Sequence, residues 1–148
     1  MNTKYPRIWI AAHGGVRKAL EVPGKPVEVL VVLARVDDWQ VQWTVARLRD
    51  TPADVLWELA ESENPAVRGA VAGNLWAPLE LLEKLAEDED WTVRGCVATN
   101  SSVSDAVLKK LLEDEAHSVR QWAKAGLTER AITKRGGWPE VQRREPEA

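Results

Sequence analysis

Three arginines, each preceded by a valine, recur at intervals of 26 residues: Arg68, Arg94 and Arg120. A guanidinium group carries a planar fork of N–H donors that matches a carboxylate or a phosphate. Three such cations at a regular spacing could follow the backbone of a nucleic acid. They are few, however, and an acidic stretch, Glu-Asp-Glu-Asp at 87–90, lies close to them in the sequence. The role of the three arginines therefore depends on the helices that position them.

The other side chains that could do chemistry do not combine into a site. His13 and His117 are far apart, and neither has a cysteine, serine or second histidine at the spacing of a catalytic triad or a metal site. Cys96, the single cysteine, falls on the buried face of a predicted helix, where a thiol is unreactive. The acidic stretch at 87–90 lacks the glycine and the spaced oxygen ligands of a calcium loop. We therefore expect no enzymatic activity, no metal and no cofactor.

The 26-residue interval extends over most of the chain. Prolines and leucines share it with the arginines: Pro26, Pro52 and Pro78; Leu30, Leu56, Leu82 and Leu108; Leu33, Leu59, Leu85 and Leu111. A fixed period of about 20 to 50 residues is typical of stacked arrays, in which each copy buries its apolar face against its neighbours. Four copies that begin near residue 25 account for all of these positions.

Each copy contains the signals of two helices. In three copies the first helix starts with a proline, whose missing N–H costs nothing at the first helical position, and has an acidic residue in its first turn; the last copy has Ser104 at the position of the proline. The second helix starts after a good capping residue, Asp38, Asn64 or Asp90, whereas Ala116 breaks this rule in the last copy. The buried stripe of the second helix is expected at Val67, Ala70, Val71 and Asn74, and at Val93, Cys96, Val97 and Asn100.

These hairpins resemble HEAT-type repeats and, in their short period and leucine placement, the bacterial leucine-rich repeat variant. The HEAT-like element is an acidic residue five positions before Val-Arg, as in Asp88 before residues 93–94 and Asp114 before residues 119–120. The second copy has Ser62 at this position, and the first copy has Val36, with Gln42 in place of the arginine. The resemblance covers residues 25–127, and the chain lacks the cysteine cluster that accompanies some leucine-rich variants.

The resemblance implies an all-α fold, namely a right-handed α-solenoid of four two-helix repeats of 26 residues with an N-terminal capping helix. It also implies a non-enzymatic scaffold, since such repeats mostly bind other molecules. In the HEAT pattern the arginine pairs with the acidic residue of its repeat. A structural ladder is therefore the alternative to a row of arginines that binds anions.

The domain boundaries follow from the repeat register. Residues 1–24 form an N-terminal capping segment, in which residues 8–22 are expected to be half a repeat that covers Val31 and Val32. Residues 25–128 hold the four helical hairpins. Residues 129–148 form a C-terminal cap and a charged tail, which we expect to be disordered.

At 100° of rotation per residue, some positions of the second helix point away from its buried stripe. These positions are small in the middle copies: Gly69, Ala72, Gly95 and Ala98. Glycine inside a helix costs roughly 0.5–1 kcal/mol relative to alanine, so two glycines at one register position need an explanation. Either successive second helices pack closely here, or the small residues form a trough for a partner, with Trp43 at one end and Gln121 and Lys124 at the other.

The chain has eight tryptophans and no phenylalanine. Trp39 and Trp91 share a register position at the start of the second helix, where we expect them to pack against the turn between helices. Trp57 and Trp76 are expected to be more exposed, and exposed tryptophan is enriched among the residues that dominate binding interfaces. Trp76 therefore joins the candidate site.

Composition limits the class of protein. The chain is 45% hydrophobic and 29% charged with a net charge of −3, and no apolar run approaches the roughly 18 residues of a membrane helix. We expect a cytoplasmic protein of bacterial or phage origin that acts as a monomer or a weak homodimer. The preferred function is a scaffold or adaptor that binds another protein through the second helices. The alternative is a nucleic-acid-binding module that uses Arg68, Arg94 and Arg120.

Overall fold

A computed structural model describes residues 6–135, and every regular element among them is a helix. The helices are α1 (Pro6–Ala12), α2 (Val16–Glu21), α3 (Val27–Ala34), α4 (Trp39–Arg47), α5 (Ala53–Leu59), α6 (Pro65–Ala72), α7 (Leu79–Leu85), α8 (Trp91–Thr99), α9 (Asp105–Leu111) and α10 (His117–Lys134). The expected all-α fold class is confirmed.

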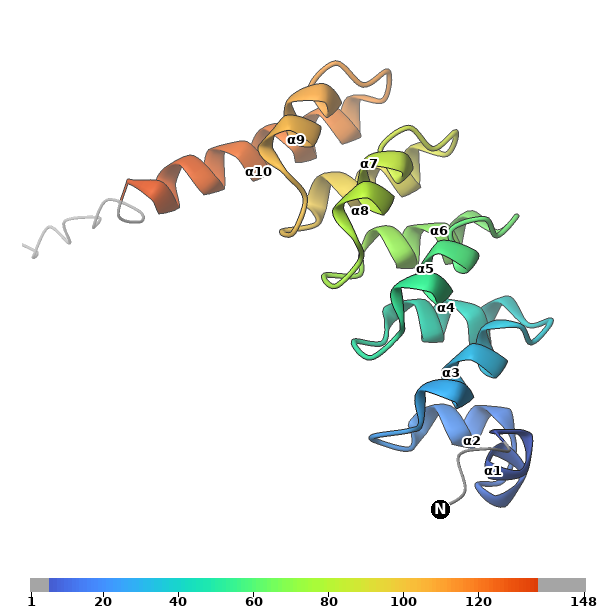
Figure 1. The fold of residues 1–148 in the computed structure, drawn as a ribbon. Coiled ribbons are helices and arrows are strands. Elements are labelled where there is room, and N and C mark those ends of the chain that lie inside the picture. The colour runs from blue at the N-terminus through green and yellow to red at the C-terminus, as the bar shows by residue number, and fades with distance from the viewer. Residues whose placement is uncertain (1–5, 136–148) are drawn as a thin grey trace, which may run out of the picture.

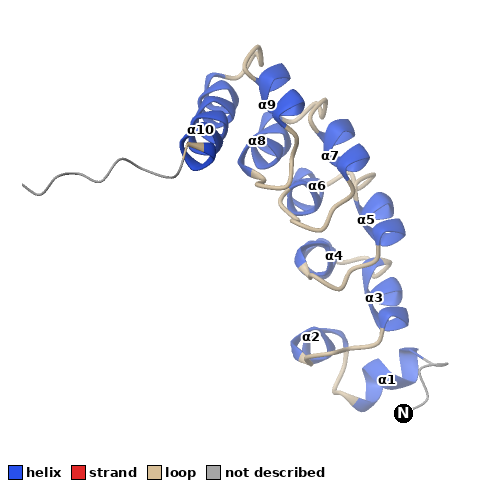
Figure 2. Ribbon diagram, turned by 60° about the vertical axis from the view of Figure 1, so that its left-hand side comes forward, coloured by secondary structure: helices blue, strands red, loops and turns tan. Residues whose placement is uncertain are grey.

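The helices form two rows that run the length of the array (Figures 1 and 2). Odd-numbered helices lie along the outer, convex side, and even-numbered helices lie along the inner, concave side (Figure 2). The contacts from α4 to α6, from α6 to α8 and from α8 to α10 are the most extensive of any in the described residues. The even-numbered row is therefore the closely packed seam of the array.

The core lies between the two rows and follows the repeat register. Leu56, Leu82 and Leu108 of the outer row are completely buried, as are the valines that precede the three arginines in the inner row. Most of these helices have only seven to nine residues. Isolated helices of that length are not stable in water, so burial against the neighbouring pair must supply their stability.

Capping residues set the start of most helices. The side chains of Asp38, Asn64 and Asp90 accept hydrogen bonds from backbone N–H groups in the first turn of α4, α6 and α8, and Ala116 provides no such bond to α10. Pro26, Pro52 and Pro78 lie at the N-cap, one residue before the predicted position, because their ψ angles are extended.

Two buried asparagines join consecutive helix pairs. The Nδ2 group of Asn74 donates to the carbonyl oxygens of Ala46 at 2.7 Å and of Leu48 at 3.2 Å, at the end of α4. Asn100 donates in the same way to Ala72 at 2.7 Å and to Asn74 at 3.1 Å, at the end of α6. The last carbonyl groups of a helix lack partners within it. Each asparagine therefore caps the preceding inner helix and fixes its own helix pair on that neighbour.

The two ends of the array differ from the expected caps. The N-terminal segment contains two helices rather than one: α1 packs on α3, α2 packs on α4, and Val31 and Val32 are half-buried. The expectation of a single capping helix is wrong, because Gly14 and Gly15 adopt positive φ angles and turn the chain between α1 and α2. At the other end α10 continues through the predicted boundary at residue 128. Residues 136–148, the expected tail, lie outside the described residues.

Replacement of Leu82 by alanine tests the packing. Leu82 is fully buried in α7, at the middle of the array, so Leu82→Ala is expected to lower the free energy of unfolding by roughly 2–5 kcal/mol. Leu79→Ala is the matched control, because Leu79 lies in the same helix and is half exposed. Urea denaturation measures both variants. Equal unfolding free energies would show that the core has been placed wrongly.

Candidate functional site

The side chain of Arg68 is held between two helix pairs. Its Nε and Nη2 groups donate to the two carboxylate oxygens of Asp88 at 2.8 and 2.9 Å. Its Nη1 group donates to the carbonyl oxygens of Ser62 and Glu63, in the loop before its own helix. Asp88 belongs to the loop between α7 and α8, so the ion pair crosses from one helix pair to the next.

Arg94 repeats this arrangement. Its Nε and Nη2 groups donate to Asp114 at 2.7 and 3.0 Å, and its Nη1 group donates to the carbonyl oxygens of Asp88 and Glu89. The hydrogen bonds from Arg94 are the main cause of a pKa for Asp114 below the ordinary value of an aspartate. A bidentate pair of this kind is both strong and geometrically specific.

The two pairs decide between the interpretations of the arginine row. Arg68 and Arg94 are only 8% and 7% exposed, and both edges of each guanidinium group are occupied. Their selection as partner-binding residues is therefore wrong, and the ladder is structural. The expected pairing within one repeat is also wrong. Each arginine reaches the acidic residue 20 positions later, in the following helix pair.

Arg120 occupies the last position of the ladder. Its Nη1 group makes the same two bonds, to the carbonyl oxygens of Asp114 at 2.6 Å and Glu115 at 2.9 Å. No carboxylate among residues 6–135 binds its Nε and Nη2 groups, because no further helix pair follows α10 in this range. Arg120 is half-buried and is the member of the predicted row that stays accessible.

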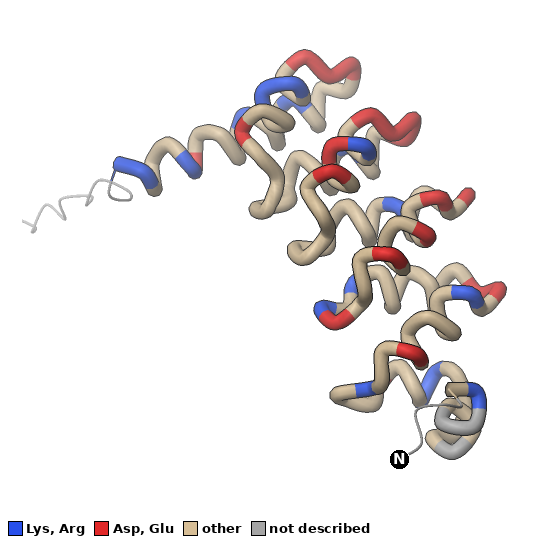
Figure 3. The backbone as a smooth tube through the Cα atoms, viewed as in Figure 1, with Lys and Arg blue, Asp and Glu red and all other residues tan. Residues whose placement is uncertain are grey.

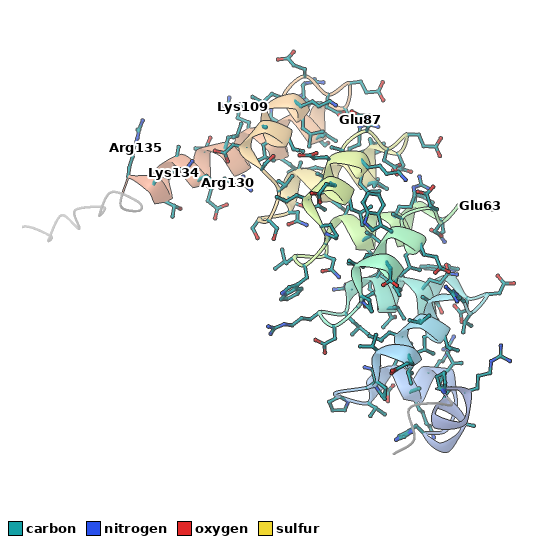
Figure 4. The ribbon with its side chains drawn as sticks, viewed as in Figure 1. Glu63, Glu87, Lys109, Arg130, Lys134 and Arg135 are labelled. Atoms are coloured by element: carbon teal, nitrogen blue, oxygen red, sulfur yellow. The ribbon has the colours of Figure 1, made fainter. Side chains whose placement is uncertain are left out.

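Acidic side chains gather on the edge of the array at which the inner helices begin (Figure 3). They lie in the loops that lead from odd-numbered to even-numbered helices, at 61–64, 87–90 and 113–116 (Figure 3). Glu63 and Glu87 point outward on this edge (Figure 4). Exposed ion pairs link successive outer helices: Arg35 with Glu58, Lys84 with Glu61 and Lys110 with Glu87. Such exposed pairs contribute little stability, so they do not define a site.

Three of the four small residues predicted to line a trough are buried in the packed seam. Ala72 and Ala98 are inaccessible, and Gly95 lies directly under the ring of Trp122. Of the two interpretations of these residues, close packing between successive second helices is the one that the structure supports at Ala72, Gly95 and Ala98, because each inner helix packs against its own outer helix and against both neighbours in its row. Their selection as residues that line an open trough is therefore wrong. Only Gly69 keeps an open side.

An open groove of about 540 Å³ lies over α6, between α4 and α8. Trp43, Leu75 and Trp76 form apolar parts of its wall, and Gly69 and Gly73 form part of its floor. We call this the α6 groove. Both tryptophans of its lining carry an arginine on the ring face: Arg47 lies 4.3 Å from the ring centre of Trp43, and Arg49 lies 5.2 Å from that of Trp76. Trp43, Gly69 and Trp76 of the predicted site therefore come together.

The α6 groove has little acid–base chemistry. Arg47 is the charged residue of its lining, and no carboxylate belongs to it. Cys96 at its edge is half-buried rather than fully buried, and burial is the main cause of the raised pKa of its thiol. The groove is therefore suited to hold an apolar group, with a cation at its rim.

A second groove of about 500 Å³ lies between the end of α8 and α10. Trp122, Arg130 and Lys134 contribute to its lining, and both cations bind Asp105, at 2.8 and 3.1 Å. Figure 4 shows Arg130, Lys134 and Arg135 along the projecting part of α10. Gln121 and Lys124, the predicted C-terminal end of the trough, lie on a separate exposed face of α10.

The exposure of the tryptophans differs in part from the prediction. Trp57 and Trp76 are exposed as expected, and Trp39 and Trp91 are also about half exposed. Trp91 stacks on Trp122, with ring centres 6.2 Å apart and planes 16° apart. The importance of Trp122 was missed. Gly95 was the available signal, because a residue without a side chain in a helix indicates a close neighbour.

Comparison with known proteins identifies no relative: no family model, curated protein or solved structure matches the chain. Among residues 6–135, no helix is long and apolar enough to cross a membrane. The same range holds no group of three or more histidine, cysteine, aspartate or glutamate residues placed to bind a metal. The α6 groove is the feature from which a function can be argued.

Glutamine substitutions in the arginine ladder separate its buried and terminal members. Arg68→Gln leaves the carboxylate of Asp88 buried without its cation and is expected to cost about 3–5 kcal/mol of unfolding free energy. Arg120→Gln is expected to cost about 1 kcal/mol or less. A glutamine can keep the carbonyl bond, as Gln42 does to Val36 at 3.1 Å. Similar losses in urea denaturation would contradict the assignment of a structural ladder.

Alanine substitutions of the two glycines test the seam. A Cβ at Gly69 would make ordinary contact with Cys96 at 3.5 Å, so Gly69→Ala is expected to gain about 0.5–1 kcal/mol from helix propensity. A Cβ at Gly95 would lie 2.4 Å from Trp122, so Gly95→Ala must displace that ring from Trp91. We expect Gly95→Ala to be less stable than Gly69→Ala and to lose the near-ultraviolet circular dichroism of the stacked pair. Equal stabilisation with an unchanged spectrum would show that Trp122 does not rest on Gly95.

Proposed function

We propose that this chain is a HEAT-like, right-handed α-solenoid of four two-helix repeats, preceded by a capping helix pair, and that it binds a segment of another protein without catalysing a reaction. The 26-residue register of the buried leucines supports the repeat, as do the identical asparagine and arginine bonds in successive helix pairs. The proposed binding surface is the inner row of helices.

The α6 groove is the observation that carries this proposal. The seam is filled by side chains at α8, where Trp122 covers Gly95, but it stays open at α6. Trp76 at the groove is 52% exposed, and Leu75 beside it is nearly as exposed. Exposed apolar side chains that surround a concave surface are typical of a binding site for an apolar anchor residue.

The charges around the α6 groove indicate the chemistry of its ligand. Arg47 and Arg49 stand over two tryptophans of the wall, and the lining contains no carboxylate, although the whole chain has a net charge of −3. Complementary charge favours specific partners and speeds their association. The favoured ligand is therefore a peptide segment with a bulky apolar side chain next to aspartate or glutamate.

The nucleic-acid alternative loses most of its support. Binding to phosphates needs accessible cations along a continuous face. Arg68 and Arg94 are buried in ion pairs, and Arg120 is the member of the row that forms no ion pair within residues 6–135. A protein segment in the α6 groove therefore remains the preferred ligand.

Peptide selection tests the proposed function. A random peptide library displayed on phage is selected against the full chain, and the recovered peptides are synthesised with a fluorescent label. We expect peptides that combine an aromatic or leucine residue with acidic residues. Trp76→Ala is expected to weaken their binding about 30-fold, which corresponds to a loss of about 2 kcal/mol at an interface hot spot. Fluorescence anisotropy measures the dissociation constants.

Trp57→Ala is the matched control, because Trp57 is exposed on α5 and lies outside the groove. It should leave peptide affinity unchanged. Peptides that bind Trp76→Ala as tightly as the wild type would place the binding surface elsewhere. Failure to recover any peptide, together with salt-sensitive binding of a 20-base-pair DNA duplex, would favour the nucleic-acid alternative.

A further inference from the structure

Two neighbouring joints of the inner row use the same register positions but are filled differently. The helices α6, α8 and α10 begin at residues 65, 91 and 117, at intervals of 26, so the joints between them can be compared residue by residue. In each joint a glycine faces a residue of the following helix: Gly95 faces Trp122, and Gly69 faces Cys96. The joint between α8 and α10 therefore holds an indole ring where the joint between α6 and α8 holds a thiol.

The ring of Trp122 rests on a glycine floor beside a flat wall. A Cβ at Gly95 would lie 2.4 Å from Cζ3 and 2.9 Å from Cε3 of Trp122, so the ring lies against the backbone of α8. Trp91, at the start of α8, stacks on this ring with planes 16° apart. Gly95 is buried as a result. We call this arrangement of floor and wall the indole seat.

The α6 groove contains the same indole seat without a ring. Gly69 takes the place of Gly95, Pro65 takes the place of Trp91, and Gly69 and Pro65 both line the groove. A Cβ at Gly69 would meet the thiol of Cys96 at 3.5 Å and no other side chain within 4 Å. Gly69 is partly accessible, whereas Gly95 is buried. The proline ring offers a flat apolar wall, so the seat at Gly69 has both of its surfaces and lacks the indole.

The preceding joint of the inner row also contains a tryptophan. On the 26-residue register Trp43 of α4 and Ala70 of α6 correspond to the facing pairs of the later joints, so here the large residue belongs to the earlier helix. Trp43 and Ala70 both line the α6 groove. Of the three joints from α4 to α10, the joint between α6 and α8 is the one to which neither helix contributes a tryptophan at these positions.

We propose that the α6 groove binds a tryptophan side chain of a partner protein, whose indole ring lies on Gly69 as the ring of Trp122 lies on Gly95. This inference rests on the proposed function and narrows its apolar anchor to one residue type. A tryptophan buries about 150–250 Å² in one rigid ring, whereas a branched leucine side chain cannot lie flat against the floor and the wall together. Arg47 at the rim favours an acidic residue beside this tryptophan.

Two synthetic peptides test the need for an indole ring. Both are N-acetylated and C-amidated, with the sequences Asp-Glu-Trp-Glu-Asp and Asp-Glu-Leu-Glu-Asp, and each is titrated into the full chain labelled with ¹⁵N and ¹³C. A ring that lies on Gly69 shifts the α-proton signals of this residue upfield in the nuclear magnetic resonance spectrum, as Trp122 does for Gly95. We expect this upfield shift with the tryptophan peptide, which should bind about tenfold more tightly than the leucine peptide.

Two variants test the indole seat itself. In Gly69→Ala a methyl group lies where the ring must rest, as the 2.4 Å approach at Gly95 shows, although the variant is expected to be more stable than the wild type. Its affinity for the tryptophan peptide should fall at least about tenfold, and its affinity for the leucine peptide should change less than about twofold. Cys96→Trp places an indole at the register position of Trp122. It should shift the Gly69 signals without a peptide and abolish binding of the tryptophan peptide.

The outcomes separate this inference from the proposed function. Equal affinities for the two peptides, unchanged in Gly69→Ala, would overturn the tryptophan seat and leave the proposed function standing. If neither these peptides nor any peptide from the library shifts the Gly69 signals, both are overturned. A Cys96→Trp chain that folds without covering Gly69 counts against the seat, and the peptide titrations decide if it does not fold. Shifts caused by a single-stranded oligothymidine, and not by the peptides, would overturn the proposal in favour of a nucleobase.

Discussion

The close approach of successive inner helices is the constraint on which the rest of the structure depends. Helices of seven to nine residues cannot persist alone, so each must bury its surface against the next pair. The approach brings Ala72 and Ala98 to complete or nearly complete burial and leaves no room for a larger side chain at Gly95. Because every pair supports only its neighbours, stability passes along the array through this seam.

Buried hydrogen bonds and ion pairs fix the position of each helix pair on its neighbour. An apolar seam alone would tolerate small shifts between helix pairs, whereas a buried asparagine or a bidentate arginine pair has one satisfactory geometry. Asn74 and Asn100 fix the joints at the C-terminal ends of the inner helices, and Arg68 and Arg94 fix them near the acidic loops, where the inner helices begin. No buried side-chain nitrogen or oxygen atom in the described residues lacks a partner. The polar groups therefore specify how the helix pairs stack, without the free-energy cost of a buried donor or acceptor that has no partner.

The sequence was sufficient for the features that depend on one helix pair and insufficient for those that depend on two. The period predicted the helices and the burial of Leu56, Leu82 and Leu108, because a hairpin has one apolar face whatever its neighbours do. The sequence left two alternatives open for Ala72 and Ala98, a packed seam or an open trough, because the distance between neighbouring inner helices depends on side chains of more than one helix pair. The partner of Arg68 was missed for the same reason: Asp88 becomes adjacent only after the pairs stack.

The α6 groove exists because the copies differ, not because they repeat. Gly69 and Gly95 share one register position, and in each case a residue of the following inner helix approaches the glycine: Cys96 at Gly69 and Trp122 at Gly95. The indole ring of Trp122 fills the space above Gly95, whereas the small thiol of Cys96 leaves the space above Gly69 open to Trp43 and Trp76. A regular array would have either a continuous trough or a continuous filled seam. One change in side-chain size between two copies therefore separates a filled joint at α8 from an open groove at α6.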